Sequence, residues 1–211
     1  VLKPAEQSPA IAWHLARILF EAGLPADVLQ FLPGEGETVG EAIVNHPDVD
    51  IISFTGSRDG GLLINRQAAE IKPGQDHVKR VIAEMGGKNA SIIDDDADLD
   101  EAVVGVIGSA FGYSGQKCSA CSRVYVAREV YDEFIDGLVK RADTMVIGDP
   151  TDKTVFVGPV IDEAAVARFE EAAALAANDG HIRFGGNRIT DGDLAKGTFV
   201  APTIVDGLPI D

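Results

Sequence analysis

Cysteine, tryptophan and basic side chains are scarce in this 211-residue chain. It has two cysteines and one tryptophan, and only 18 lysines and arginines against 34 aspartates and glutamates, a formal net charge of −16. A surface so poor in cations offers no basic face, which argues against nucleic-acid binding. Two cysteines do not form the disulfide framework of a small secreted domain. We therefore expect a reducing compartment, the cytoplasm or, in a eukaryote, the mitochondrial matrix.

Long apolar runs and clustered histidines are also missing. No run approaches the ~20 residues that a membrane-spanning helix needs, so we predict no transmembrane segment. The four histidines, His14, His46, His77 and His181, lie far apart and none is next to a cysteine. We therefore predict no metal site and no cysteine–histidine pair of the papain type.

What is present is an alternation of short apolar runs with helical patterns. This alternation predicts crossover units and a parallel sheet, and therefore the α/β class. The predicted strands are 28–32, 50–54, 78–84, 90–93 and 123–126, with two short ones around 183–184 and 199–205. The predicted helices start after the caps Ser8, Thr38 and Asp98, after the turn at residues 55–57, and near residues 130 and 162. The Gly86-Gly87 pair separates two predicted domains, 1–85 and 86–211.

Residues 113–123 form a loop of small residues that holds both cysteines, Cys118 and Cys121, with Lys117 directly before the first. A neighbouring cation can lower the pKa of a thiol from about 8.5 and so favour the nucleophilic thiolate. Glycines in the loop let the backbone approach a substrate closely. From these residues alone, a catalytic thiol and a structural or metal-binding pair are equally supported.

Two other features suit a catalytic cleft. Glu84 ends an apolar strand just before two glycines, a placement typical of a general base, although a solvated strand end or an ion pair with Lys88 fits as well. Residues 55–57, Thr-Gly-Ser, connect a strand to a helix, where a pyrophosphate can bind backbone N–H groups. Such turns are common without a ligand, and residues 34–36, Gly-Glu-Gly, lack the full dinucleotide fingerprint.

Five motifs together resemble the aldehyde dehydrogenase superfamily, over nearly the whole chain. They are Lys3-Pro4-Ala5-Glu6, Glu21-Ala22-Gly23-Leu24-Pro25, Phe54-Thr55-Gly56-Ser57, Glu84-Met85-Gly86-Gly87-Lys88 and Gly115-Gln116-Lys117-Cys118. They occur in the family's order, and the 34 positions from Glu84 to Cys118 match its spacing. The resemblance favours the catalytic interpretation of Cys118.

The resemblance implies a fold and a set of roles. It implies the second half of a Rossmann-type nucleotide-binding domain (1–85), followed by an α/β catalytic domain (86–211). Cys118 would be the nucleophile and Glu84 the general base. The implied cofactor-binding residues are Lys3, Glu6, Gly36, Gly56, Ser57 and Gly86. Lys3 and Glu6 match positions that hold the adenosine ribose, and Gly56 and Ser57 match those at the pyrophosphate. The implied cofactor is NAD, and NADP stays open because no acidic residue next to Lys3 opposes a 2′-phosphate.

Within the superfamily the chain is most similar to the 1-pyrroline-5-carboxylate dehydrogenase group, through residues 72–75, 103–113 and 115–120. This similarity implies NAD-dependent oxidation of L-glutamate 5-semialdehyde to L-glutamate in proline degradation, with Ser119 binding the substrate's α-carboxylate. Another aldehyde, such as succinate semialdehyde, is the alternative, as is an inactive fragment that retains only the fold or a binding role. The implied partners are a small-molecule substrate and, for a longer parent, a second copy or a fused proline dehydrogenase. Both ends suggest a central fragment with little activity of its own.

Two positions depart from the family pattern. Cys121 stands where glycine or alanine is commoner, and we expect a buried, inert thiol there. A reversible disulfide with Cys118 under oxidation is the alternative. Gly60 stands where a branched apolar residue is usual, so we expect weaker cofactor binding.

Overall fold

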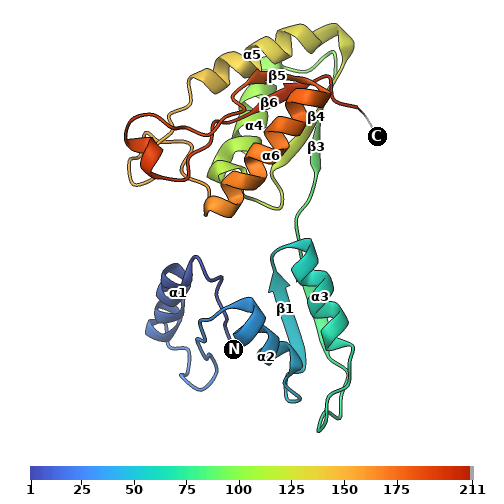
Figure 1. Ribbon diagram of the computed structural model, residues 1–211, viewed down its shortest axis with the longest axis vertical. Coiled ribbons are helices and arrows are strands. Elements are labelled where there is room, and N and C mark those ends of the chain that lie inside the picture. Colours follow the sequence, from blue (N-terminus) through green and yellow to red (C-terminus); the bar gives the residue numbers. More distant parts are fainter. Residues whose placement is uncertain (210–211) are drawn as a thin grey trace. The chain divides into compact units, whose positions relative to one another are not determined.

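The structure, a computed structural model, describes residues 1–209 and divides into two compact units, Val1–Gly86 and a second that begins at Gly87 (Figure 1). The first unit contains α1 (Pro9–Glu21), the π-helical turn η1 (Gly36–Gly40), α2 (Glu41–Asn45), β1 (Ile51–Thr55), α3 (Arg58–Ala68) and β2 (Arg80–Glu84). No helix among the described residues is both long and apolar enough to cross a membrane.

Strands β1 and β2 pair in parallel, with α3 as the crossover between them, as the alternating pattern predicts. Their register runs from Ile51 opposite Arg80 to Thr55 opposite Glu84, so both strands end at the same edge. Ser57 caps α3, and its Oγ accepts a hydrogen bond from the Gly60 N–H at 3.1 Å. The cap satisfies one of the free N–H groups at the start of the helix.

A small core holds this unit together. Its buried residues are Val44, Ile52 and Ala68. Lys79 is buried beside them, and its Nζ donates to the carbonyl oxygens of Val44 and His46 at 2.6 and 2.7 Å. These bonds occupy carbonyls at the end of α2 that lack helical partners. Burial lowers the pKa of Lys79.

The predicted strand at 28–32 is wrong. The structure has a single parallel bridge there, between Leu2 and Phe31. The Leu2 N–H donates to Gln30 and the Leu32 N–H donates to Leu2. The ladder stops after these bonds because the next donor, two residues beyond Leu2, would be Pro4, which has no N–H.

The predicted cap at Thr38 is also wrong. Thr38 lies inside η1, and the residue that precedes this turn is Glu35. The turn begins earlier because the Gly36 N–H already donates to the carboxylate of Glu6, at 2.6 Å. A side chain distant in sequence therefore starts this turn, which local pattern reasoning does not detect.

Helix α1 begins at Pro9 after Ser8, as predicted, although the Ser8 side chain makes no capping hydrogen bond. Its apolar face is largely open. Ala16 is its buried residue, whereas Ile11 and Ile18 are 69% and 60% exposed.

The second unit contains two pairs of strands. Its elements are β3 (Asn89–Ile93), α4 (Leu99–Phe111), η2 (Gly112–Gly115), β4 (Cys121–Val126), η3 (Arg128–Val130), α5 (Tyr131–Asp143), α6 (Glu163–Asp179), β5 (His181–Phe184), η4 (Gly192–Lys196) and β6 (Ile204–Asp206). β3 and β4 pair in parallel with α4 as the crossover, and β5 and β6 pair antiparallel. The predicted strand at 199–205 is reduced to β6 and an isolated antiparallel bridge between Arg188 and Val200.

Helices and strands of this unit share one core around Phe134, whose side chain is fully buried. The other buried members are Ile93, Val103, Val106, Ile107, Cys121, Ile135, Leu138, Ala142 and Ile204. The predicted cap of α4 is confirmed, because the Asp98 carboxylate accepts from the Glu101 N–H at 3.0 Å. β4 begins at Cys121 rather than at residue 123, since Cys121 belongs to the core.

Candidate active site

Cys118 lies near the tip of a β-turn that leads into β4. The turn spans Lys117 to Ala120, and the Ala120 N–H donates to the Lys117 carbonyl at 3.2 Å. Cys118 and Ser119 are its two central residues, and both are exposed. The exposed thiol can reach a substrate, and the hydrogen-bonded turn holds its backbone in place.

The segment before this turn has an unusual backbone. Tyr113, Ser114 and Gly115 have φ angles of 58°, 56° and 70°. For a residue other than glycine, this left-handed conformation costs about 1–3 kcal/mol and persists only where the surroundings hold it. Such outliers cluster at functional sites.

Two side chains anchor this segment. The Ser114 Oγ donates to the carbonyl of Gly158 at 2.9 Å, and the Gln116 Oε1 accepts from the Ile161 N–H at 2.9 Å. Both partners belong to the stretch that precedes α6, so one distant segment fixes the loop at two points.

Cys121 has a different environment from Cys118. It is 8% exposed, and its Sγ lies 3.3 Å from the Ser91 Oγ and donates to the Arg123 carbonyl at 3.3 Å. Its N–H donates to the Ser109 Oγ at 3.1 Å. The expectation of a buried thiol is therefore confirmed. A disulfide with Cys118 would require Cys121 to leave these contacts.

Asn89, at the start of β3, was missed by sequence reasoning. Its Nδ2 donates to the Cys118 carbonyl at 2.8 Å and lies 3.5 Å from the Ala120 carbonyl. The available signal was an asparagine directly after Gly86-Gly87-Lys88, at the point where the next strand begins. Only the pairing of β3 with β4 brings it to the cysteine turn, and this pairing is not a local property.

Glu84 and the predicted phosphate turn meet at the carboxyl edge of the first sheet. Glu84 is the register partner of Thr55, and its carbonyl accepts from the Gly56 N–H at 3.0 Å. Gly56 and Ser57 are exposed directly before the 11-residue helix α3. N–H groups at the start of a helix attract anions, so this edge can hold a phosphate group next to a carboxylate.

Lys3, Glu6 and Gly36 form a second cluster in the first unit. The Lys3 Nζ donates to the Gly34 carbonyl at 2.7 Å and lies 3.4 Å from the Glu6 carboxylate. Hydrogen bonds from the backbone N–H groups of Glu6 itself and of Gly36 hold the pKa of the Glu6 carboxyl below its usual value. A fixed cation beside a fixed carboxylate offers a donor and an acceptor, which suits the hydroxyl groups of a sugar.

Gly60 faces the ring of Phe54. A Cβ at position 60 would lie 3.1 Å from the ring and 3.1 Å from the Ser57 Oγ, and a Cβ at Gly56 would lie 2.5 Å from the same ring. The aromatic ring thus occupies space that side chains at these two positions would need. Weaker cofactor binding through Gly60 stays a prediction.

The structure brings the predicted residues together in three sets. Glu84, Gly56 and Ser57 share one edge of the first unit, and Cys118 and Ser119 share one turn of the second. Lys3, Glu6 and Gly36 form their own cluster, and Gly86 is the last residue of the first unit. The action of Glu84 on Cys118 stays a prediction, as do the functional names of the two units.

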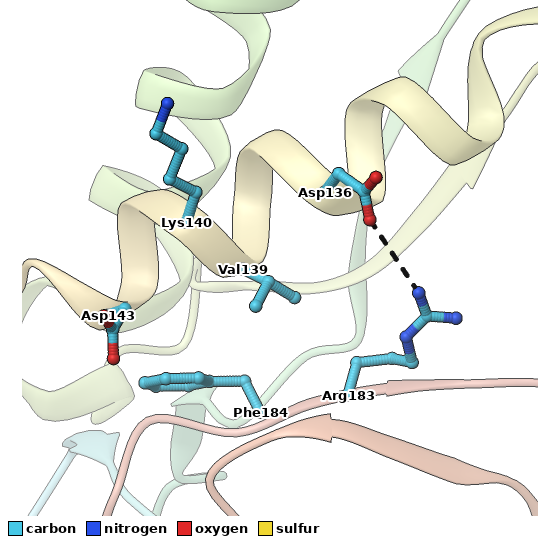
Figure 2. A pocket seen from close by; sticks show the side chains of 6 residues that line it. All are labelled: Asp136, Val139, Lys140, Asp143, Arg183 and Phe184. Carbon is cyan, nitrogen blue, oxygen red and sulfur yellow. Dashed lines mark ion pairs between the residues drawn. The ribbon is translucent and has the colours of Figure 1, made fainter.

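A pocket of about 370 Å³ lies elsewhere on the second unit, between α5 and β5 (Figure 2). It is lined by Asp136, Val139, Lys140, Asp143, Arg183 and Phe184. The Arg183 guanidinium reaches across it to Asp136, at 4.0 Å. None of the predicted site residues lines this pocket.

A sequence model of the aldehyde dehydrogenase family matches residues 1–211. The chain belongs to the aldehyde dehydrogenase family. The resemblance drawn from the five motifs is therefore confirmed, and the mixed helix and strand arrangement is that of the family's α/β fold.

Known aldehyde dehydrogenases and related proteins match almost the whole chain. A 1-pyrroline-5-carboxylate dehydrogenase of Geobacillus sp. (strain WCH70) is 46% identical over 204 residues, which are 97% of this chain and 39% of that relative. The crystal structure of 1-pyrroline-5-carboxylate dehydrogenase from Thermus with bound NAD superposes with a TM-score of 0.91 at 39% identity, over 98% of this chain and 39% of that one.

A third match is the crystal structure of proline utilization A from Bdellovibrio bacteriovorus. It has a TM-score of 0.91 and 52% identity, and covers 98% of this chain and 21% of that longer one. The chain thus spans about two-fifths of the length of the curated relatives that it matches.

Proposed function

We propose that this chain carries the nucleophile of an NAD-dependent aldehyde dehydrogenase that oxidises L-glutamate 5-semialdehyde to L-glutamate. The observation that carries the proposal is the contrast between the two thiols. Cys118 is exposed on an anchored turn, whereas Cys121 is buried and hydrogen-bonded. Only the first has the access that a nucleophile needs.

In the first step the Cys118 thiolate attacks the aldehyde carbon. The Sγ–C bond forms while the carbonyl electron pair moves to oxygen. The resulting oxyanion needs N–H donors, and the N–H of Cys118 itself is our candidate. A donor of this kind typically contributes about 3–4 kcal/mol to lowering the barrier.

Two groups of residues in the first unit fit parts of a dinucleotide. The start of α3 and the exposed Gly56 and Ser57 suit its pyrophosphate, and the Lys3–Glu6 pair suits a ribose. NAD, when bound, would accept the hydride that leaves the former aldehyde carbon, so that a thioester remains on Cys118. We prefer NAD to NADP because a related Thermus structure contains bound NAD.

Glu84 completes the reaction as general base. Its carboxylate takes a proton from water while the water oxygen attacks the thioester carbon. The C–S bond then breaks, glutamate leaves, and Cys118 regains its thiolate. General bases typically contribute a factor of about 10²–10⁴. The exposed position of Glu84 at the end of β2, where its carboxylate is open to water, supports this role.

The substrate assignment rests on the relatives that carry the name 1-pyrroline-5-carboxylate dehydrogenase. Ser119, exposed next to Cys118 on the same turn, is the residue that we propose for the α-carboxylate of the substrate. A hydroxyl donor next to the nucleophile would favour an acidic aldehyde over an alkyl aldehyde of similar length. The match to proline utilization A supports a role in proline degradation.

The test is NADH formation by the full-length protein with glutamate 5-semialdehyde, succinate semialdehyde and butanal. We expect the highest kcat/KM with glutamate 5-semialdehyde, and a Ser119→Ala variant should lose this preference mainly through KM. Equal kcat/KM values for the three aldehydes would contradict the substrate assignment, and no NADH from any of them would contradict the activity.

A further inference from the structure

We propose that Asn89 is a positioning residue for Cys118. Its side-chain amide fixes the peptide group between Cys118 and Ser119, which holds the nucleophile in the turn. The inference rests on the proposed role of Cys118 and extends it to a residue that does not itself touch the reacting atoms.

The contact is a direct one. The Asn89 Nδ2 donates to the Cys118 carbonyl oxygen at 2.8 Å, a normal hydrogen-bond length, and lies 3.5 Å from the Ala120 carbonyl. Because a peptide group is planar, fixing the Cys118 carbonyl also fixes the direction of the Ser119 N–H. One amide thus orients the backbone of both residues proposed to meet the substrate.

Two backbone features adapt the chain to this contact. A Cβ at Gly87 would lie 2.9 Å from the Cys118 carbonyl, so the close approach of the two segments requires a glycine. The β3–β4 register also shifts there, from Asn89 opposite Cys121 to Ala90 opposite Arg123, so Ser122 is an extra residue in β4. Bulges of this kind turn side chains and are common next to active sites.

Asn89 contributes little to the core. It is exposed and lies outside the buried cluster of the second unit. Its replacement should therefore leave the fold largely intact and release the turn. When a nucleophile is displaced by up to about 1 Å, the rate of attack on the substrate falls while the affinity for the substrate is retained.

The experiment compares Asn89→Ala and Asn89→Asp in the full-length protein with Asn187→Ala and Asn187→Asp. Asn187 is a matched control, since it is exposed and its Nδ2 also donates to a backbone carbonyl, that of Arg188, at 3.0 Å. The measurements are kcat and KM for aldehyde oxidation, the melting temperature, and the rate of Cys118 alkylation by iodoacetamide as a function of pH.

For Asn89→Ala we expect kcat to fall roughly ten- to a hundredfold, with KM for NAD and the melting temperature close to those of the control. For Asn89→Asp, which is nearly the same size, we also expect the alkylation profile to move to higher pH. A carboxylate cannot donate to the carbonyl when ionised, and its charge opposes the thiolate.

Two results would overturn the inference. One is a kcat for the Asn89 variants equal to that of the Asn187 variants, and the other is a loss of kcat only in proportion to a loss of folded protein. If the unmodified protein oxidises no aldehyde, the proposed function fails instead. The alkylation profile then still decides whether Asn89 acts on Cys118.

Discussion

The N–H of Gly56 donates a hydrogen bond to the carbonyl oxygen of Glu84, with 3.0 Å between the two atoms. The first residue after β1 is thereby tied to the last residue of β2. Since the two strands are parallel, the proposed phosphate turn and the proposed general base are held at one edge by the sheet itself. The backbone of Glu84 is therefore fixed by the sheet, while its side chain is exposed and available to water.

Replacement of Cys118 by alanine should abolish aldehyde oxidation. Without the thiolate no covalent intermediate forms, and loss of a nucleophile typically costs a factor of roughly 10³ or more. Steady-state NADH formation by the full-length protein measures the effect.

Cys121→Ala is the matched control for Cys118→Ala. It removes a buried sulfur, so we expect a loss of about 1 kcal/mol in unfolding free energy and oxidation within a few-fold of normal. If Cys121→Ala were inactive and Cys118→Ala active, the assignment of the two thiols would be reversed.

Ser57→Ala should weaken both the fold and NAD binding. The serine Oγ accepts from the Gly60 N–H, and loss of such a cap costs about 1 kcal/mol. Because the same residue lies at the proposed pyrophosphate site, the Kd for NAD should also rise. Urea unfolding and NAD titration measure the two effects.

Asp98→Ala separates these two effects, because Asp98 caps α4 in the same way. It should cost a similar unfolding free energy and leave the Kd for NAD unchanged. An equal rise of the Kd in both variants would show that Ser57 acts only through stability.

His77 should make the protein more stable at mildly acidic pH. Hydrogen bonds to the Val49 carbonyl and then to the Asp76 carboxylate raise the pKa of His77 above the ordinary 6.5. When folding raises the pKa of a group, the protonated group stabilises the folded protein. This stabilisation is complete below the pKa that the group has in the unfolded chain, and it is lost as the pH rises through the pKa in the folded protein. The melting temperature should therefore fall as the pH rises above about 6.5, the unfolded pKa.

The histidine at position 14 provides the control. His14 is exposed on α1. His77→Gln should flatten the pH dependence and His14→Gln should keep it. An unchanged slope in His77→Gln would assign the effect to another group.

Local signals in the sequence predicted much of the fold. The cap Asp98 was found because a capping residue before an apolar helical pattern is a local feature. β1 and β2 were found as apolar runs, and the start of α3 was found as the polar turn that follows β1. The five motifs led to the family because they combine order with spacing. The failures come from partners distant in sequence. The Gly36 N–H donates to the Glu6 carboxylate, so η1 begins at Gly36 and Thr38 lies inside it instead of capping a helix.

The candidate site follows the same rule. Cys118 could be named because of its neighbours in the sequence, and Cys121 could be expected to be buried. Asn89 could not be named, since its hydrogen bond to Cys118 joins residues 29 positions apart and depends on the register of β3 and β4. The left-handed backbone at Tyr113 and Ser114 was hidden for a similar reason, because the contacts that hold it come from the stretch before α6.

The central claim is that Cys118 and Glu84 act in succession on one substrate. Glu84→Gln keeps the size of the side chain and removes the base, so hydrolysis should slow by about 10²–10⁴-fold while the thioester still forms. Glu70→Gln, which removes an exposed carboxylate paired with Lys72, is the control.

The most direct measurement is mass spectrometry of peptides from the full-length Glu84→Gln protein, quenched in acid after reaction with NAD and glutamate 5-semialdehyde. The account predicts a glutamyl thioester on the peptide that contains Cys118, removed by hydroxylamine and absent from Glu70→Gln. A Glu84→Gln protein that turns over at the normal rate with no adduct, or an adduct located on Cys121, would contradict it.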